Sequence, residues 1–558
     1  MLLSINMAIC LWLFAVILGT LKIFRMSPDP EGPDHFHRKE TCMSSSRKNN
    51  AMKNILAGCI TQMIMELLSF LGRTVFVQYL DISYLGINGL YGNILSVLAL
   101  AELGLGNVTQ FFLYKPVAED DQEKISRLVR YFQKLYLMIA GAIIAIGLSL
   151  IPALKYIVNC DLPEDELIIY YVLFLVNSTI SYFSAHKSAL LLAYQDNRLQ
   201  KYITVATSLL MQLLHIAVLA LWHNYTVYLC TTTFTACLQV VLVNSISSRK
   251  YPLKKLSSAA KVSKEEKKYL AHNVKATFIY KIGGTIISNT DNILISVLVS
   301  TAAVGLYSNY FIVVMAIQGL LGIITTSLVP GIGNLSVSRN KKRMMEVLDA
   351  MLLVYHWVAA FGAISFYFLF DDLIPVWIGE RFLLDHFTVF AIVLNFYIGT
   401  AICPVWMFRE ANGIFDKVKY LQLITAGVNI ILSVIMGYLW GMAGILLATS
   451  GARLLTQIWY EPQILFGSVF QNSQRPYWKK QLWYVVLTLI ASIICWGINC
   501  LLPHGFFSMI LKGILFCIVC GSVFILGNIR SHGVAEMKAM VHQVLHGWHG
   551  CAMGDKEN

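Results

Sequence analysis

Apolar runs of about 20 residues or more recur along nearly the whole chain, separated by short polar stretches. Such a run, folded as an α-helix, crosses the roughly 30 Å hydrocarbon core of a bilayer. Because backbone groups in lipid must be hydrogen-bonded within the protein, we expect helices and no open sheet. The pattern predicts about fourteen transmembrane helices, at residues 54–80, 86–112, 131–158, 166–193, 202–222, 225–247, 275–300, 303–329, 348–376, 386–408, 418–439, 441–460, 481–502 and 506–529.

The composition supports an all-α polytopic membrane protein. The chain has 558 residues, of which 57% are hydrophobic and 13% charged, whereas soluble proteins carry about 25% charged residues. Its net charge is +12, and Lys and Arg gather in alternate loops, most densely in residues 248–274. The other loops are short and acidic, with Arg381 as the exception. This alternation predicts cytoplasmic N- and C-termini and no nucleic-acid partner.

Three short motifs recur at a nearly constant spacing, which indicates an internal repeat. The spacings are 219, 218 and 223 residues, for the pairs Leu85-Gly86-Ile87 and Val304-Gly305-Leu306, Lys201-Tyr202 and Lys419-Tyr420, and Leu150-Ile151-Pro152 and Leu373-Ile374-Pro375. Each repeat holds six spans, an even number, so both halves enter the membrane from the same side. The two six-helix bundles are therefore predicted to be parallel repeats, with a C-terminal helix pair added.

These observations predict six segments. They are an N-terminal extension at 1–42, a six-helix bundle at 43–247, a basic cytoplasmic linker at 248–274, a second bundle at 275–460, a linker and helix pair at 461–530, and a cytoplasmic tail at 531–558. The extension contains an apolar run that is a poor signal peptide. Two interpretations are possible: the extension forms one extra helix, or the native protein starts at Met43 and lacks it. The second interpretation is favoured.

A polar stripe runs through the first span. Gln62, Glu66, Ser69 and Arg73 follow one another at steps of four, three and four, so they share one helix face. A charged side chain inside a membrane costs roughly 2.5–3.5 kcal/mol on insertion scales and usually faces a polar interior. We therefore expect this face to line a central cavity.

The repeat gives this stripe a counterpart in the span at 275–300. The offset of 219 leads to Lys281, Thr285, Ser288 and Asn292, with Asp291 adjacent. Polar residues also hold neighbouring membrane helices together without lining a cavity. We favour that role for Ser69, Thr285 and Ser288, and a cavity-facing position for the charged residues.

Six motifs occur in a characteristic order along the chain: Gly72-Arg73-Thr74, Tyr84-Leu85-Gly86-Ile87-Asn88-Gly89-Leu90, Ala101-Glu102-Leu103-Gly104-Leu105-Gly106, Leu113-Tyr114-Lys115-Pro116-Val117-Ala118-Glu119, Asp291-Asn292-Ile293-Leu294-Ile295 and Val304-Gly305-Leu306-Tyr307. They resemble the bacterial polysaccharide flippases, including those for O-antigen, capsule and teichoic-type polymers, of the multidrug/oligosaccharidyl-lipid/polysaccharide (MOP) exporter superfamily. The resemblance covers about residues 43–530. It does not identify the sugar.

The resemblance implies two six-helix bundles around a central cavity, as in MATE-type transporters, with no enzymatic activity. It implies that undecaprenyl-diphosphate-linked oligosaccharides move to the outer leaflet of the bacterial cytoplasmic membrane by alternating access. A polymerase and glycosyltransferases of the same pathway are the implied protein partners, and membrane lipid surrounds the chain.

The chemistry of a lipid diphosphate suits the cations of the stripes. Arg73 is the best candidate for a phosphate contact, followed by Lys281, because cations bind phosphate oxygens and Arg does so in a bidentate manner. Arg453, in the inner part of a later span, is a third candidate. A snorkelling position at the membrane interface explains Arg453 equally well.

The acidic residues of these spans have more than one possible role. Glu66 and Asp291 are either salt-bridge partners or ligands of a coupling ion, H⁺ or Na⁺. Glu102 is near Gly104 and Gly106, so a structural turn is favoured there over ion binding. We expect no other cofactor, and no metal site in the tail histidines His542, His546 and His549.

Two alternative functions remain open. A cation-coupled multidrug exporter of the same superfamily would have a more aromatic and acidic cavity, without the cationic face. A membrane polysaccharide polymerase or ligase would need a large outer loop with catalytic residues. The longest candidate outer loop, at 376–386, has only about ten residues, so this alternative is the weaker one.

Overall fold

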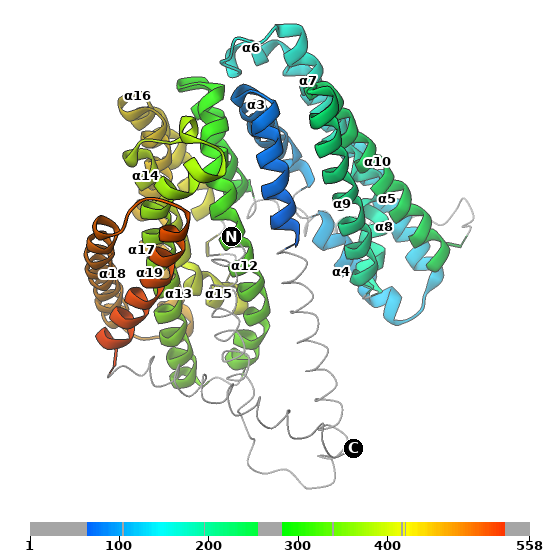
Figure 1. The fold of residues 1–558 in the computed structure, drawn as a ribbon. Helices are drawn as coiled ribbons and strands as arrows, with labels where there is room; N and C mark the ends of the chain where they lie inside the picture. The colour runs from blue at the N-terminus through cyan, green and yellow to red at the C-terminus, as the bar shows by residue number, and fades with distance from the viewer. Residues whose placement is uncertain are drawn as a thin grey trace, which may run out of the picture. The chain divides into compact units, whose positions relative to one another are not determined.

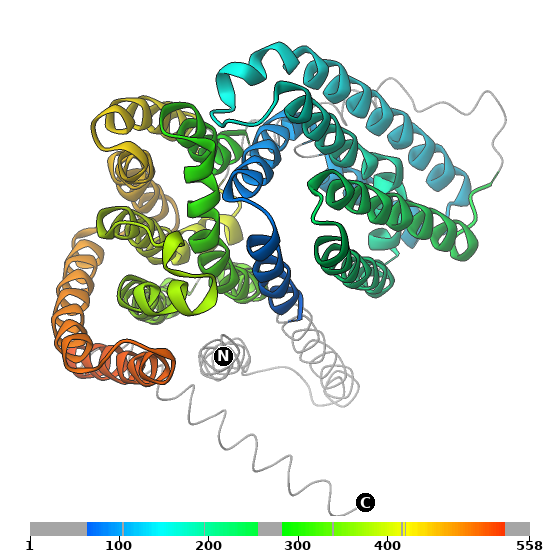
Figure 2. The same cartoon turned by 45° about the horizontal axis from the view of Figure 1, so that its top comes forward.

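The computed structural model describes residues 64–102, 105–194, 196–254, 282–337, 340–414, 417–418 and 420–529, and these residues contain helices and no strand (Figures 1 and 2). The predicted all-α polytopic fold is confirmed. Ten helical segments in the described part are long and apolar enough to cross a membrane. They are Gln122–Ile157, Glu164–Ala193, Arg198–Trp222, Tyr225–Lys250, Thr301–Ser336, Lys341–Trp377, His386–Ala411, Leu421–Phe470, Arg475–Leu501 and Phe506–Gly527.

Three predicted spans differ in detail from these segments. The spans 54–80 and 275–300 are helical at 64–79 and 282–298, the residues that the structure describes. The predicted span 86–112 is not one helix. It falls on three elements, α3 (Ile82–Leu98), η1 (Ala99–Glu102) and α4 (Leu105–Ala118). The α-helix therefore ends before the Gly104–Gly106 segment, where an irregular turn was expected.

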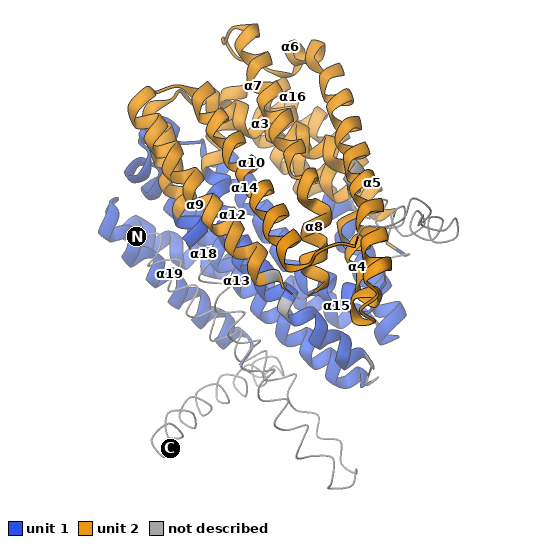
Figure 3. Ribbon diagram, turned by 90° about the vertical axis from the view of Figure 1, so that its right-hand side faces the viewer, with its two compact units in different colours: residues 1–67, 310–417, 453–558 blue, residues 68–309, 418–452 orange. Residues whose placement is uncertain are grey.

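The chain forms two compact units, coloured separately in Figure 3. Unit 1 comprises Met1–Leu67, Tyr310–Lys417 and Arg453–Asn558, and unit 2 comprises Leu68–Asn309 and Val418–Ala452. The six predicted segments concern the repeat, which these units do not test, and they stay a prediction. Residues 1–42, most of the basic linker and the tail 531–558 lie outside the described residues.

Unit 2 is built around α8 (Tyr182–Ala193), which packs against α4, α5 (Gln122–Ser149) and α10 (Tyr225–Lys250). Its other elements are the helix residues 68–79 and 301–309, α3, η1, η2 (Ile151–Ala153), α6 (Leu154–Ile157), α7 (Glu164–Ile180), α9 (Asn197–Trp222), the helix at 282–298 and most of α16 (Leu421–Leu455). Polar residues in the loops cap several of these helices. Asp81 accepts from the Ser83 backbone N–H at 2.9 Å and begins α3.

Unit 1 is built around α13 (Lys341–Trp377), which packs against α14, α15, α18 and α19. These helices cover His386–Ala401, Cys403–Ala411, Arg475–Leu501 and Phe506–Gly527. The remaining elements are most of α12 (Thr301–Val337), η3 (Glu380–Phe382), α17 (Gln457–Leu465) and the π-helix η4 (Phe466–Phe470).

A sharp kink divides α16 into two arms, which correspond to the predicted spans 418–439 and 441–460. Trp440 and Gly441 have non-helical backbone angles, and Gly441 has φ +58°, a conformation that glycine adopts without strain. A Cβ atom on Gly444 would lie 1.9 Å from the Met436 carbonyl oxygen. The two arms therefore approach each other so closely that only glycine fits.

The helix bounds repeat at the spacing found in the sequence. Ile82 and Thr301, where α3 and α12 begin, are 219 positions apart, and so are Ala118 and Val337, where α4 and α12 end. The same spacing separates Gln122 from Lys341, the first residues of α5 and α13. These bounds support the repeat.

The repeat-related glycines Gly86 and Gly305 make reciprocal contacts. A Cβ atom on Gly86 would lie 1.9 Å from the Thr301 carbonyl oxygen, and one on Gly305 would lie 2.5 Å from the Ile82 carbonyl oxygen. Ile82 and Thr301 are themselves repeat-related. The contact of Gly86 with Thr301 is thus repeated by their equivalents, Gly305 and Ile82, which is the pattern that a two-fold axis produces. The local pseudo-axis of the repeat therefore passes between α3 and α12.

We expect Gly86→Ala to destabilise this crossing, because the methyl group would collide with a backbone oxygen that no side-chain rotation can remove. The cost of such overpacking is about 1–3 kcal/mol. The midpoint of thermal unfolding in detergent measures it. Gly92→Ala on the same helix is the matched control, since a Cβ atom there meets nothing within 4 Å. Equal midpoints for the two variants would contradict the close approach.

Candidate functional site

Arg73 lies on the helix at 64–79, within the predicted span 54–80, and is bonded to α12. Its Nη1 donates to the Ser308 hydroxyl at 3.0 Å, and this hydroxyl donates to the Gly305 carbonyl at 2.8 Å. The Tyr228 phenol is close enough to interact electrostatically with the guanidinium group. A guanidinium has five N–H donors in a fixed planar arrangement. Ser308 thus orients a cation that retains the capacity to donate further hydrogen bonds.

Polar residues on α9 and α10 surround this position, and the sequence analysis missed them. His215 is buried, stacks on Tyr228 with ring centroids 3.8 Å apart, and bonds to the Thr232 hydroxyl at 2.9 Å. The Gln212 amide occupies the space above Gly72, where a Cβ atom would lie 2.5 Å from its oxygen. His215 and Gln212 could have been found from the sequence, because they are polar residues within an apolar span, the criterion that selected Glu66.

The rest of the first stripe is partly described. Glu66 and Ser69 are half-buried on the same helix as Arg73, and Gln62 lies outside the described residues. Glu66 takes part in a polar or electrostatic interaction of its own. That this face lines a cavity stays a prediction.

Asp291, on the helix at 282–298, belongs to a polar cluster in unit 2. The Thr449 hydroxyl lies 2.8 and 3.0 Å from its two carboxylate oxygens, and the Asn429 amide donates to Thr449 at 2.8 Å. The same amide lies 3.4 Å from the Ser433 hydroxyl. Asn429 and Thr449 come from opposite arms of the α16 kink, so Gly441 and Gly444 help to bring them together.

Within this cluster, Oδ1 of Asn429 is buried without a hydrogen-bond partner among the described residues. Buried polar atoms are almost always bonded, so such exceptions require an explanation. A carboxylate beside hydroxyl and amide oxygens is the ligand set of a hard cation.

The other predicted site residues are more dispersed. Thr285 is half-buried on the Asp291 helix and Ser288 is exposed there, while Lys281 and the side chain of Glu102 lie outside the described part. Arg453 contacts α14, since a Cβ atom on Gly399 would lie 3.0 Å from its Nη1. Their proposed roles remain predictions.

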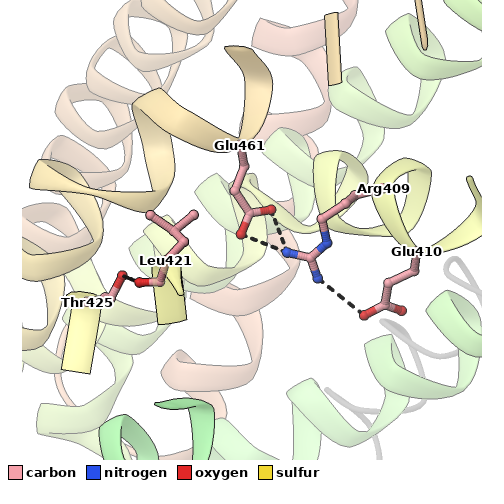
Figure 4. A network of polar contacts seen from close by, with 5 residues as sticks. All are labelled: Arg409, Glu410, Leu421, Thr425 and Glu461. Carbon is pink, nitrogen blue, oxygen red and sulfur yellow. Dashed lines mark hydrogen bonds and ion pairs between the residues drawn. The ribbon is translucent and has the colours of Figure 1, made fainter. Parts of the chain in front are cut away.

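Unit 1 contains a buried ion pair that the sequence analysis missed (Figure 4). Nη1 of Arg409, on α15, lies 2.7 Å from both carboxylate oxygens of Glu461, on α17. The two side chains are only 4% and 0% exposed. Glu410 lies at the edge of this pair, with its carboxylate 3.5 Å from Nη2 of Arg409. The pair joins α15 to the segment that follows α16.

A second buried pair joins α13 to α19. Nζ of Lys512 lies 2.8 Å from Oδ2 of Asp372, and both side chains are fully buried. Nδ1 of the exposed His504 lies 2.6 Å from the other oxygen of Asp372. The insertion cost that selected Glu66 and Arg73 applies to these residues too. They sit near the ends of predicted spans, where charge is common, and they were therefore overlooked.

We expect Arg409→Met and Glu461→Leu each to destabilise the protein strongly. Each single change leaves a buried charge without its partner, which costs about 3–5 kcal/mol. The double variant removes both charges and should recover much of the loss. Unfolding midpoints of all four proteins in one detergent check this, and a double variant as unstable as the singles would contradict it.

The described residues form the fold of an all-α polytopic membrane protein. Residues 51–336, more than half of the chain, match the sequence profile of the family described as "Polysaccharide biosynthesis protein". The chain therefore belongs to the polysaccharide biosynthesis protein family, in agreement with the predicted resemblance. No curated protein sequence matches it.

Solved structures show a similar fold. The lipid II flippase MurJ in an inward closed conformation has a TM-score of 0.63 and 15% identity, over 85% of this chain and 100% of its own. An inward-facing MATE family multidrug resistance transporter of the MOP superfamily has a TM-score of 0.58 and 14% identity, over 73% and 99%. A mutant of the Vibrio cholerae MATE transporter VcmN has a TM-score of 0.52 and 13% identity, over 76% and 99%. At these identities the likeness establishes the fold alone.

Proposed function

We propose that this protein is a flippase that moves undecaprenyl-diphosphate-linked oligosaccharide units across the bacterial cytoplasmic membrane for surface polysaccharide biosynthesis. Family membership supports a role in polysaccharide biosynthesis, and the transporter fold supports movement of a substrate across the membrane. The observation that carries the proposal is Arg73, a cation inside a membrane helix that a hydroxyl from α12 holds in place.

The substrate's chemistry explains why such a cation is needed. A diphosphate is anionic and does not cross hydrocarbon unaided, and its oxygens accept paired hydrogen bonds from a guanidinium. Ser308 uses one N–H of Arg73 and leaves donors for phosphate. Lys281 and Arg453 are proposed as further phosphate contacts. Glycosyltransferases and a polymerase of the same pathway would supply and consume the lipid-linked unit on either side of the membrane.

Asp291 is the proposed site of coupling to a cation, Na⁺ or H⁺. The unpartnered Oδ1 atom of Asn429, whose amide donates to Thr449, supports a bound cation beside the Asp291–Thr449 contact. Glu66 is the second acidic candidate.

A cation-coupled multidrug exporter is the second candidate function, because two of the similar structures are MATE transporters. The two candidates differ in what a loss of function accumulates. Loss of a flippase raises the lipid-linked oligosaccharide pool, whereas loss of an exporter raises drug sensitivity alone.

We expect Arg73→Ala to reduce glycan export by about 10–100-fold, the loss that follows from removing a charged hydrogen bond worth about 1.5–3 kcal/mol. Undecaprenyl-diphosphate oligosaccharide should accumulate on the inner leaflet while the protein remains inserted. Extraction of the lipid-linked pool measures it. Arg73→Lys, which keeps the charge but not the bidentate geometry, should fall between wild type and Ala. Normal export by the Ala variant would remove Arg73 from the mechanism.

We expect Asp291→Asn to uncouple export from the ion gradient, since an amide cannot exchange a cation or proton as a carboxylate does. Export in cells is measured with the Na⁺ gradient and the proton gradient collapsed in turn. Thr449→Val should weaken the same dependence less, because it removes a neutral oxygen. An Asn variant that responds to both treatments as the wild type does would exclude this site.

A further inference from the structure

The repeat-equivalent helices α5 and α13 differ in their surroundings. Both begin at the equivalent position, Gln122 and Lys341. In the most apolar stretch of the segment Gln122–Ile157, 22% is buried within the protein, whereas the corresponding value for α13 is 89%. Helices α18 and α19 pack along α13, and Figures 1 and 2 show them beside it. The C-terminal pair thus makes α13 the buried centre of unit 1.

Polar contacts join this pair to α13 along most of its length. Asp349 lies against Lys480 of α18, with their charged atoms 2.5 Å apart. Nε2 of His356 lies 2.7 Å from Oε1 of Gln481. Asp372, which pairs with Lys512, lies 23 residues after Asp349 on α13, and 23 residues of an α-helix are about 35 Å long.

The equivalent positions of the first half carry this polar face only in part. The offset of 219 relates His356 to Leu137, which is 39% exposed, and Asp349 to Arg130, which donates to the Lys254 carbonyl. The local offset of 223 relates Asp372 to Ser149, whose hydroxyl donates to the Ile146 carbonyl of its own helix. The charge of Asp372 and the hydrogen bond of His356 to α18 therefore accompany the helix pair that covers α13 and are not general properties of the repeat.

The ends of α13 and α5 also differ. α5 ends at Ser149, and the chain continues as η2 and the short α6, whereas α13 runs without a break to Trp377. The Asp372–Lys512 contact lies within the last two turns of α13, and Ser149, the equivalent of Asp372 by the local offset of 223, is the last residue of α5.

We propose that α18 and α19 form a brace that holds α13 as a fixed spine of unit 1, and that the Asp372–Lys512 pair sets their register on it. A fully buried ion pair tolerates little displacement, because moving either partner exposes an unpaired charge to hydrocarbon. The contacts of α13 with this pair are therefore retained through the transport cycle. The inference goes beyond the proposed function, since it concerns which helices keep their neighbours.

A charge exchange tests the register. Asp372→Lys and Lys512→Asp should each reduce the yield of folded full-length protein by about tenfold or more, and the double exchange should recover most of it, because breaking a buried pair leaves an uncompensated charge. Size-exclusion chromatography of the detergent-solubilised protein gives the yield. Lys512→Arg keeps the charge and should stay close to wild type. Singles that fold normally, or a double exchange no better than the singles, would overturn the assigned register.

Crosslinking tests the brace. Asp349→Cys/Lys480→Cys joins α13 to α18 at a partly exposed position outside the proposed substrate and ion sites. After treatment with a short bismaleimide, this full-length double-cysteine variant should export glycan at a rate within about twofold of the untreated variant. The reason is that the contact between α13 and α18 does not change during transport. Treated wild type and the two single-cysteine variants control for the native cysteines.

The outcomes separate the two proposals. Export lost only in the crosslinked double variant would overturn the brace and leave the proposed function standing. Unimpaired export at high crosslinking yield supports the brace. Absence of glycan export from untreated wild type would count against the proposed function, and the charge exchange, which is read from folding alone, would then decide the brace.

Discussion

The cost of placing charge in hydrocarbon is the constraint on which the rest of this structure depends. An isolated ionised side chain inside a bilayer is strongly disfavoured, yet Arg409 and Asp372 lie in helices that are long and apolar enough to cross the membrane, and Arg73 and Asp291 lie in predicted spans. Each has a partner from another helix at hydrogen-bond distance. The polar partners therefore determine which helices pack together, while the apolar surfaces, being equally at home in lipid, discriminate much less.

These four groups fall into two kinds. Arg409 and Asp372 meet charges of opposite sign and are neutralised within the protein. Arg73 and Asp291 each form a hydrogen bond with a neutral hydroxyl group, from Ser308 and Thr449, and Asp291 has a further interaction of its own. A hydroxyl orients a charge without cancelling it. The first kind suits a structural role, and a guanidinium oriented by a hydroxyl suits the binding of a phosphate.

Much of the fold could be predicted because hydropathy and repeat spacing are properties of the chain itself. Apolar runs gave the helical spans, and the 219-residue offset reappears in the helix bounds and in the Gly86–Gly305 contact. The kink at Gly441 falls at the boundary between the predicted spans 418–439 and 441–460, whereas the break after Leu98 was harder, because that segment is as apolar as a continuous helix. Partners such as Ser308 and Thr449 could not be predicted at all, since tertiary packing selects them among many similar hydroxyls.

The asymmetry between the halves links these observations. Two equivalent bundles would satisfy the same hydropathy pattern, yet α13, unlike its repeat equivalent α5, carries a buried charge with a dedicated partner on an added helix pair. Conversely, the hydroxyl-held Arg73 and Asp291 both belong to unit 2. Of these four groups, the two in buried ion pairs thus lie in one unit and the two bonded to hydroxyls in the other. In the proposed transport cycle both kinds have a use, because a substrate-binding group must be held in place by a part of the protein that keeps its shape.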